Sequence, residues 1–178
     1  IINADDFYGN NSFKNAFQYM SRKENRKNFG LVCYKLSETL SEFGSVSRGI
    51  CKVKNDKLVS INEYLKIQQE NNIIFDSNTG KTLQGDDLVS MNFWICKNDF
   101  FIFLENYIIR CIGELKNIEK DEIYLPFAIK EYSEFNNMEI DVLRSMSKWF
   151  GITYIEDKKE SIKKLKVLTE NKLYPSPL

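Results

Sequence analysis

Short apolar segments with the character of β-strands alternate with segments of helical periodicity along the whole chain. With 178 residues and no linker or repeat, the sequence is most simply one α/β domain, 1–178, with inserted hairpins. The predicted strands are 31–34, 50–53, 58–61, 73–75, 82–83, 89–95 and 139–143, followed by an extended segment at 149–154. The first predicted helix follows Gly9 and ends at Asn28-Phe29-Gly30. Two more begin at Asn98 and Pro126, and a last helix carries Ile162, Leu165 and Leu168 on one apolar stripe.

The first nine residues have the pattern of a buried strand that ends in two carboxylates and a glycine turn. Asp5 and Asp6 stand between this strand and a helix whose predicted apolar face is Phe13, Ala16, Phe17 and Met20. In open α/β sheets, ligands collect beyond the carboxyl ends of strands, and Mg²⁺ needs only one or two protein carboxylates plus substrate phosphates. The pair therefore indicates a Mg²⁺ and phosphate site. The alternative is an ordinary role for aspartate in a turn or at a helix start.

The chain opens with Ile1 rather than Met, and its first residues have the pattern of an interior strand rather than a frayed terminus. We therefore expect this sequence to be cut from a longer protein.

Composition narrows the classes of function. Lys+Arg and Asp+Glu balance at 25 each, so no global field favours nucleic acid, and no segment reaches the roughly 20 apolar residues of a membrane span. The four cysteines are far apart in apolar or alternating segments, which favours buried, reduced thiols and a cytoplasmic protein. Without histidine, Ser-His-Asp and Cys-His catalysis are excluded, and chemistry that needs no strong general base fits best.

Four separated blocks together resemble a known family. They are Ile2-Asn3-Ala4-Asp5-Asp6-Phe7-Tyr8-Gly9, Leu40-Ser41-Glu42-Phe43-Gly44-Ser45-Val46-Ser47-Arg48-Gly49, Val89-Ser90-Met91-Asn92-Phe93-Trp94 and Trp149-Phe150-Gly151-Ile152-Thr153-Tyr154. In order and spacing they resemble the bacterial sugar-phosphate nucleotidyltransferases, which include glucose-1-phosphate thymidylyltransferases and uridylyltransferases. The resemblance covers the chain from Ile1 to about Pro175.

This resemblance implies a mixed-sheet, Rossmann-like (GT-A-like) α/β fold with inserted hairpins, incomplete at its N-terminus. It also implies a reaction in which a sugar-1-phosphate attacks the α-phosphorus of a nucleoside triphosphate and releases pyrophosphate with Mg²⁺. A phosphate oxygen is already ionised at neutral pH, so positioning and charge stabilisation suffice. The sugar, or another phosphorylated acceptor such as phosphocholine, and the base are not determined by the sequence, and homo-oligomer formation stays open.

The resemblance also implies roles for single residues. Asp5 takes the place of the metal-binding aspartate, and Asp6 is the fallback. Gly44 resembles the glycine of the turn whose backbone approaches the sugar. Glu63 takes the place of the glutamate that accepts hydrogen bonds from sugar hydroxyls, and Lys66 is the candidate for the displaced phosphate-binding lysine. Asn92 and Trp94 are the remaining candidates for the sugar pocket, although Trp94 also suits a plain core position.

Two departures from the family concern the metal and the nucleotide. Gly151 replaces the second metal-binding aspartate of the family's Trp-x-Asp, so Asp157 becomes the substitute ligand, with a helix cap as its alternative role. The family's glycine-rich loop and its Arg and Lys would precede residue 1. We therefore expect the parent protein to be the enzyme, this chain alone to be inactive, and a non-catalytic sugar-phosphate-binding or structural fragment to be the alternative.

Overall fold

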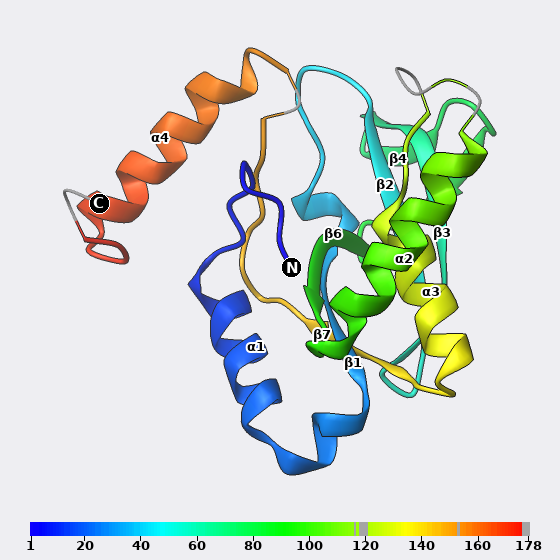
Figure 1. Ribbon diagram of the computed structural model, residues 1–178. Helices are drawn as coiled ribbons and strands as arrows, with labels where there is room; N and C mark the ends of the chain where they lie inside the picture. The colour runs from blue at the N-terminus through cyan, green and yellow to red at the C-terminus, as the bar shows by residue number, and fades with distance from the viewer. Residues whose placement is uncertain (116, 118–120, 153, 176–178) are drawn as a thin grey trace.

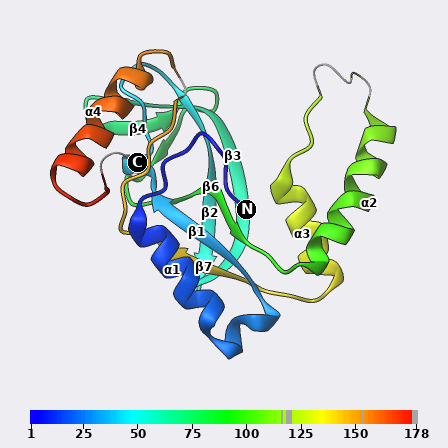
Figure 2. The ribbon, with the colours of Figure 1, turned by 60° about the vertical axis from the view of Figure 1, so that its left-hand side comes forward.

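The structure is a computed structural model that describes residues 1–115, 117, 121–152 and 154–175. Its sheet has the strand order β2-β6-β1-β7-β3-β4-β5, and an additional β2–β3 pairing closes five of these strands into a barrel (Figures 1 and 2). Thr153 of the predicted segment 149–154 lies outside the described residues. The strands are β1 (Phe29–Lys35), β2 (Val46–Lys54), β3 (Lys57–Glu70), β4 (Ile73–Asp76), β5 (Lys81–Leu83), β6 (Leu88–Ile95) and β7 (Ile140–Arg144); the helices are α1 (Asn10–Ser21), α2 (Asp99–Glu114), α3 (Leu125–Phe135) and α4 (Asp157–Glu170), with short 3₁₀ turns at Lys23–Lys27 and Leu36–Glu38.

The predicted Rossmann-like fold is wrong, because the strands close into a barrel instead of forming an open, mostly parallel sheet. Among the described strand pairs, β1 and β7 are parallel and all the others are antiparallel. The physical cause is the β2–β3 hairpin. Its turn residues Asn55 and Asp56 both have positive φ, 51° and 56°, which suits the right-handed twist of two long strands. The hairpin then curls far enough for β2 to pair with β6 and β3 with β7.

The barrel closes between β3 and β7 through a small number of polar contacts. Lys57 pairs with Asp141 across the seam, and the backbone N–H of Val142 donates to the carbonyl oxygen of Asp56 at 2.8 Å. Although burial opposes it, hydrogen bonds from Lys57, Tyr19 and Asn28 hold the pKa of Asp141 below its usual value. This carboxylate therefore joins β7 to β3 and to α1.

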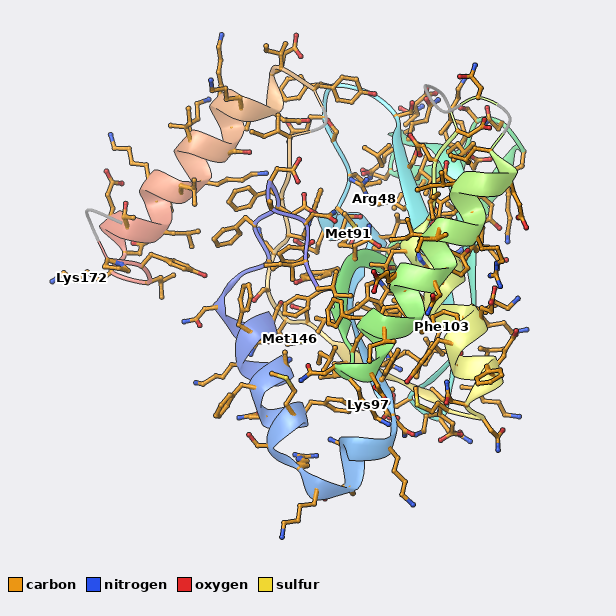
Figure 3. All side chains as sticks on the ribbon, in the orientation of Figure 1. Arg48, Met91, Lys97, Phe103, Met146 and Lys172 are labelled. Atoms are coloured by element: carbon orange, nitrogen blue, oxygen red, sulfur yellow. The ribbon has the colours of Figure 1, made fainter. Side chains whose placement is uncertain are left out.

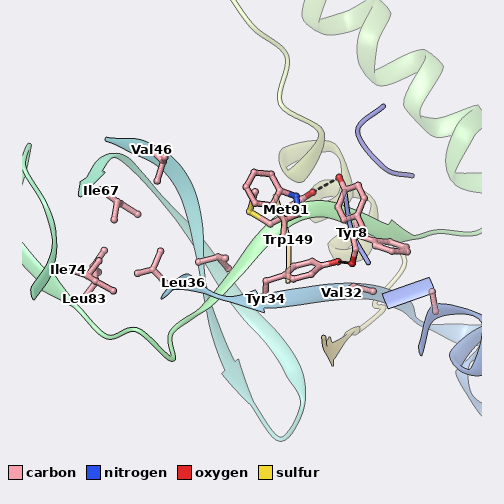
Figure 4. Packing of buried hydrophobic residues seen from close by; sticks show 13 residues of the cluster. Tyr8, Val32, Tyr34, Leu36, Val46, Ile67, Ile74, Leu83, Met91 and Trp149 are labelled. Carbon is pink, nitrogen blue, oxygen red and sulfur yellow. Dashed lines mark hydrogen bonds between the residues drawn. The ribbon is translucent and has the colours of Figure 1, made fainter. Parts of the chain in front are cut away.

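Two clusters of buried side chains form the core. One takes residues from all five barrel strands and from α2 and α3; it includes Phe29, Leu31, Trp94, Phe100 and Ile129. The other packs against the opposite faces of β1 and β6, where Figure 4 shows Tyr8, Tyr34 and Trp149 grouped together. Strand β6 is buried on both faces, as its apolar sequence predicts.

Most elements are confirmed, but the predicted face of α1 is wrong. The helix buries Ser12, Ala16 and Tyr19, whereas Phe13, Phe17 and Met20 are 47%, 67% and 57% exposed. The buried face makes polar contacts, in which the Tyr19 hydroxyl donates to Asp141 at 2.6 Å and the Ser12 hydroxyl contacts that of Tyr34 at 2.7 Å. The helix also ends at Ser21, before the predicted stop.

The remaining helices lie outside the barrel. Helices α2 and α3 lie side by side, while α4 stands beside the N-terminal residues on the other side of the molecule (Figures 1 and 2). The first residues do not form the predicted strand, although Ile1 and Trp94 exchange two backbone hydrogen bonds of 2.8 and 3.0 Å. Within the described part of the chain, no helix is long and apolar enough to cross a membrane.

Candidate functional site

A polar pocket of about 230 Å³ lies where the N-terminal residues meet β2, β3, β6 and the segment after β7. Arg48 and Met91, two of its lining residues, are labelled in Figure 3. The residues that line it are Asn3, Asp6, Ser47, Arg48, Gly49, Glu63, Ser90, Met91, Asn92, Trp149 and Ile152. The pocket thus combines two carboxylates, one guanidinium, two amides and two hydroxyls.

Asp6 is held in this pocket by its own neighbours in the chain. Its Oδ2 accepts a hydrogen bond from Asn3 Nδ2 at 2.9 Å and lies 3.1 Å from the Tyr8 hydroxyl. That hydroxyl is itself tied to β6, 2.7 Å from the carbonyl oxygen of Met91. Burial raises the pKa of Asp6 above its usual value, and the hydrogen bonds from Asn3 and Tyr8 oppose this rise. The carboxylate is therefore both desolvated and oriented.

Asn92 enters the pocket through a β-bulge in β6. Val32 of β1 pairs with Phe93, but the next residue, Cys33, pairs with Ser90, so Met91 and Asn92 fall outside the ladder. Asn92 has φ 59°, a left-handed conformation that asparagine adopts more readily than most residues. Bulges of this kind re-aim a side chain next to a site. Here the bulge brings the Asn92 amide to the pocket.

Arg48 is buried between the pocket and the core. Its Nε and Nη2 donate to the carbonyl oxygen of Thr39 and its Nη1 to that of Ser47, and its guanidinium carbon lies 4.9 Å from the centre of the Trp149 ring. Burial lowers the pKa of Arg48 to about 10, although the charges of Asp6, Asp157 and Glu63 oppose this shift. Arg48 thus stays a cation at neutral pH among three carboxylates.

Glu63 reaches the pocket because its cross-strand partner is a glycine. Gly49 pairs with Glu63, and a Cβ added to Gly49 would lie 2.7 Å from Glu63 Oε1. Only a residue without a side chain leaves room for this carboxylate. Burial raises the pKa of Glu63, and the nearby charge of Arg48 opposes the rise.

Trp149 and Gly151 close the pocket next to Asp6. A Cβ added to Gly151 would lie 2.5 Å from Asp6 Oδ1 and 2.8 Å from Cζ2 and Cη2 of Trp149. Trp149 is 8% exposed, and its indole N–H is buried without a hydrogen-bond partner in the described part of the chain. That N–H nevertheless helps to lower the pKa of Asp6, so it lies close to the carboxylate.

The structure brings three of the predicted site residues together and places the others elsewhere. Asp6, Glu63 and Asn92 line the pocket. Lys66 and Trp94 do not: Lys66 is exposed, with its backbone N–H bound to Asp76 Oδ1 at 3.1 Å, and Trp94 is 1% exposed in the barrel core.

Gly44 and the two predicted metal ligands also lie outside the pocket. The close approach at Gly44 is made by Tyr154, whose Oη would lie 2.6 Å from an added Cβ. Asp5 is exposed in the turn before Asp6. Asp157 is the first residue of α4, and its carboxylate accepts hydrogen bonds from the Tyr154 backbone N–H at 2.7 Å and the Ser41 hydroxyl at 3.1 Å. Asp5 and Asp157 are therefore not brought together at this pocket.

A three-ligand metal cluster is absent from the part of the chain that the structure describes. Mg²⁺ does not require one, because it keeps several waters and shares substrate phosphates. Asp5 offers an exposed carboxylate beside the pocket residue Asp6, which fits this minimal mode of binding. Both oxygens of the Asp157 carboxylate are engaged, which makes it a poor second ligand.

Sequence reasoning missed Arg48 and Trp149 as site residues. A signal for Arg48 was present, because it occupies the same strand face as Val46 and Ile50, where an unpaired cation is costly. Trp149 carried no such signal, since both tryptophans lie in apolar segments.

A larger cavity of about 800 Å³ lies under α4 and shares Arg48 and Trp149 with the pocket. Its charged lining is balanced, with Arg48, Lys148, Lys163 and Lys164 against Glu38, Glu42, Asp157 and Glu160. Lys163 and Glu160 pair with each other at 2.6 Å.

No protein-family model matches this sequence, and no curated protein matches it. The resemblance to the sugar-phosphate nucleotidyltransferases therefore stays a prediction from the sequence.

Proposed function

We propose that this chain is the acceptor-binding portion of a sugar-phosphate nucleotidyltransferase, and that the polar pocket holds the sugar of a sugar-1-phosphate. One observation carries the proposal. All four sequence blocks behind the resemblance, which are spread over residues 2–154, contribute to the same pocket. They supply Asn3 and Asp6, then Ser47–Gly49, then Ser90–Asn92, and finally Trp149 and Ile152.

The size and chemistry of the pocket support a sugar as its occupant. At about 230 Å³ the pocket falls below the range of about 300–1,000 Å³ that is common for drug-sized ligands, so it suits a single ring better than a nucleotide. Carboxylates, amides and hydroxyls on all sides match the alternating donors and acceptors of a polyol. Among the described residues, the cation that lines it is Arg48, which is already bound to backbone carbonyls. The phosphate of the substrate is therefore assigned to the mouth of the pocket.

The proposed reaction needs positioning more than proton transfer. An ionised phosphate oxygen of the acceptor forms a bond to the α-phosphorus of the nucleoside triphosphate, and the bond to the bridging oxygen breaks, so that pyrophosphate leaves. The chain has no histidine, which agrees with a reaction that requires no strong base. Bound Mg²⁺ would neutralise the phosphate charge, with Asp5 as the candidate ligand.

Calorimetric titration of the chain with glucose, galactose and mannose 1-phosphates tests the pocket. We expect at least one to bind, and Glu63→Gln to weaken that binding about tenfold or more, because a neutral amide replaces a carboxylate that accepts hydroxyls. Glu70→Gln is the matched control, since Glu70 lies on the same strand outside the pocket. If neither sugar phosphates nor phosphocholine binds, the proposal is wrong.

A second experiment separates an enzyme fragment from a non-catalytic binding module. We expect Mg²⁺ to strengthen sugar-phosphate binding and Asp5→Asn to remove this effect, with the exposed Asp86→Asn as the control. In the parent enzyme, Asp5→Asn should abolish most turnover. Binding that ignores both Mg²⁺ and Asp5→Asn would instead indicate a non-catalytic module.

The chain alone should release no pyrophosphate from any nucleoside triphosphate in the presence of Mg²⁺ and a sugar-1-phosphate. Measured release would show that nucleotide binding belongs to this chain, contrary to the expectation from its sequence.

A further inference from the structure

The indole N–H of Trp149 is a buried donor that makes no hydrogen bond of ordinary geometry in the described part of the chain, although it lies close to the Asp6 carboxylate. Its nitrogen is shielded from solvent, and Trp149 lines the pocket. A buried donor without a partner costs about 1–3 kcal/mol, and folded proteins leave few of them. Such a group at the wall of a pocket therefore points to an acceptor that arrives with a ligand.

The Trp149 ring cannot easily turn to find another partner. The Arg48 guanidinium covers one face of the ring, with its carbon 4.9 Å from the ring centre. Gly151 lies against Cζ2 and Cη2 so closely that an added Cβ would be 2.8 Å from either atom. Arg48 over one face and Gly151 near the edge of the ring therefore restrict its rotation.

An acceptor carboxylate oxygen lies beside this donor. A Cβ added to Gly151 would lie 2.5 Å from Asp6 Oδ1 and 2.8 Å from two ring carbons of Trp149. The carboxylate oxygen and the ring are therefore both close to this position. The other oxygen, Oδ2, accepts hydrogen bonds from the Asn3 amide and the Tyr8 hydroxyl. Oδ1 is thus the carboxylate oxygen left to face a ligand next to the indole N–H.

A fixed donor next to a fixed acceptor selects for a particular functional group. A hydroxyl can accept a hydrogen bond and donate one at the same time, whereas a carbonyl cannot donate and an ammonium cannot accept. A phosphate oxygen would be repelled by the carboxylate. The pair therefore suits a hydroxyl group.

We propose that Asp6 and Trp149 together bind one hydroxyl of the acceptor's sugar ring, which donates to Asp6 Oδ1 and accepts from Trp149 Nε1–H. This inference rests on the proposed function of the pocket. It makes Trp149 a specificity-determining residue that distinguishes a hydroxyl at one ring position from hydrogen. A site built to bond a hydroxyl discriminates strongly against the analogue without it, because its own polar groups are then left unpaired.

The test compares ring-modified substrates on two forms of the protein. The first is the wild type, and the second carries benzothienylalanine at position 149, in which sulfur replaces the N–H and the ring shape is kept. The sugar phosphate that binds the wild type best is compared with its monodeoxy analogues by calorimetry. Trp149→Phe, with its fold checked by circular dichroism, provides a second variant that lacks the N–H.

We expect one deoxy position to weaken wild-type binding about tenfold more than it weakens binding to the benzothienylalanine form. At all other positions the two proteins should lose affinity by the same factor. Equal losses at every position would overturn the role of Trp149 and leave the proposed function intact. Absence of binding by any sugar phosphate to the wild type would overturn the proposed function and this inference with it.

Discussion

Substitution of Gly151 by alanine should damage both stability and binding, because the glycine is where Asp6 and Trp149 meet. The new methyl carbon would lie 2.5 Å from Asp6 Oδ1 and 2.8 Å from two Trp149 ring carbons. Carbon contacts are favourable at about 3.5–4.0 Å, so one neighbour would have to move by about 1 Å. Neither moves freely, since Asn3 and Tyr8 hold the carboxylate and Arg48 covers the ring.

Overpacking of this kind typically costs about 1–3 kcal/mol in the free energy of unfolding. For a chain of this length that corresponds to a fall in melting temperature of roughly 2–4 °C per kcal/mol. Urea unfolding followed by circular dichroism measures the loss, and calorimetry should show that sugar-phosphate affinity falls as well.

Gly113→Ala is the matched control for this substitution. An added Cβ there has no atom within 4 Å, and in helix α2 alanine should be neutral or stabilising by up to about 1 kcal/mol. If Gly151→Ala unfolds at the same urea concentration as the wild type and binds equally well, then the contact between Asp6, Gly151 and Trp149 is wrong.

Three further substitutions test other contacts. Arg48→Met should lower the free energy of unfolding by about 2–4 kcal/mol, because two backbone carbonyls lose their donors and a ring contact is lost; unchanged urea unfolding would contradict this. Gly49→Ala should weaken sugar-phosphate binding about tenfold or more in calorimetry, since the methyl would crowd Glu63 Oε1 at 2.7 Å; full affinity would refute the crowding. Asp141→Asn should cost about 1–3 kcal/mol at neutral pH, because hydrogen bonds from Lys57 and others lower the Asp141 pKa despite burial. That stability is fully present above the unfolded pKa of 3.8 and is lost as the pH falls through the lower pKa of the folded state, so the difference in unfolding free energy between the two proteins should shrink in acid; a constant difference would count against the linkage.

Local chemistry made much of the secondary structure predictable. The hairpin turn at Lys54-Asn55-Asp56-Lys57 could be predicted because Asn and Asp tolerate positive φ, and both adopt it. The predicted hairpin across 73–83 is confirmed as β4 and β5 for the same kind of reason. Periodicity likewise located β1, β6 and β7.

Strand pairing could not be predicted in the same way. Closure of the barrel depends on Lys57 meeting Asp141, 84 positions away, and periodicity carries no information about such partners. The alternation of strands and helices is compatible with an open sheet and with a barrel, and the family resemblance implied the open Rossmann-like sheet, which is wrong. The face of α1 also differs from the prediction, since the helix buries Ser12, Ala16 and Tyr19 and leaves Phe13 and Phe17 exposed.

Some of the predicted site residues line the candidate pocket and others do not. Asp6, Glu63 and Asn92 were chosen by resemblance, and all three line one pocket. Trp94 lies in the core instead, where it pairs with Leu31 of β1 and both side chains belong to the same buried cluster. Its place beside the pocket is taken by Trp149, which sequence periodicity alone could not distinguish from a core residue.

The most direct test of the central claim is a crystal structure of the protein with a bound sugar-1-phosphate and Mg²⁺. The proposal predicts the sugar ring in the polar pocket, in contact with Glu63, Asn92 and Asp6, and its phosphate at the mouth. A sugar found instead in the larger cavity under α4, or a pocket that stays empty at saturating ligand, would contradict the proposed function.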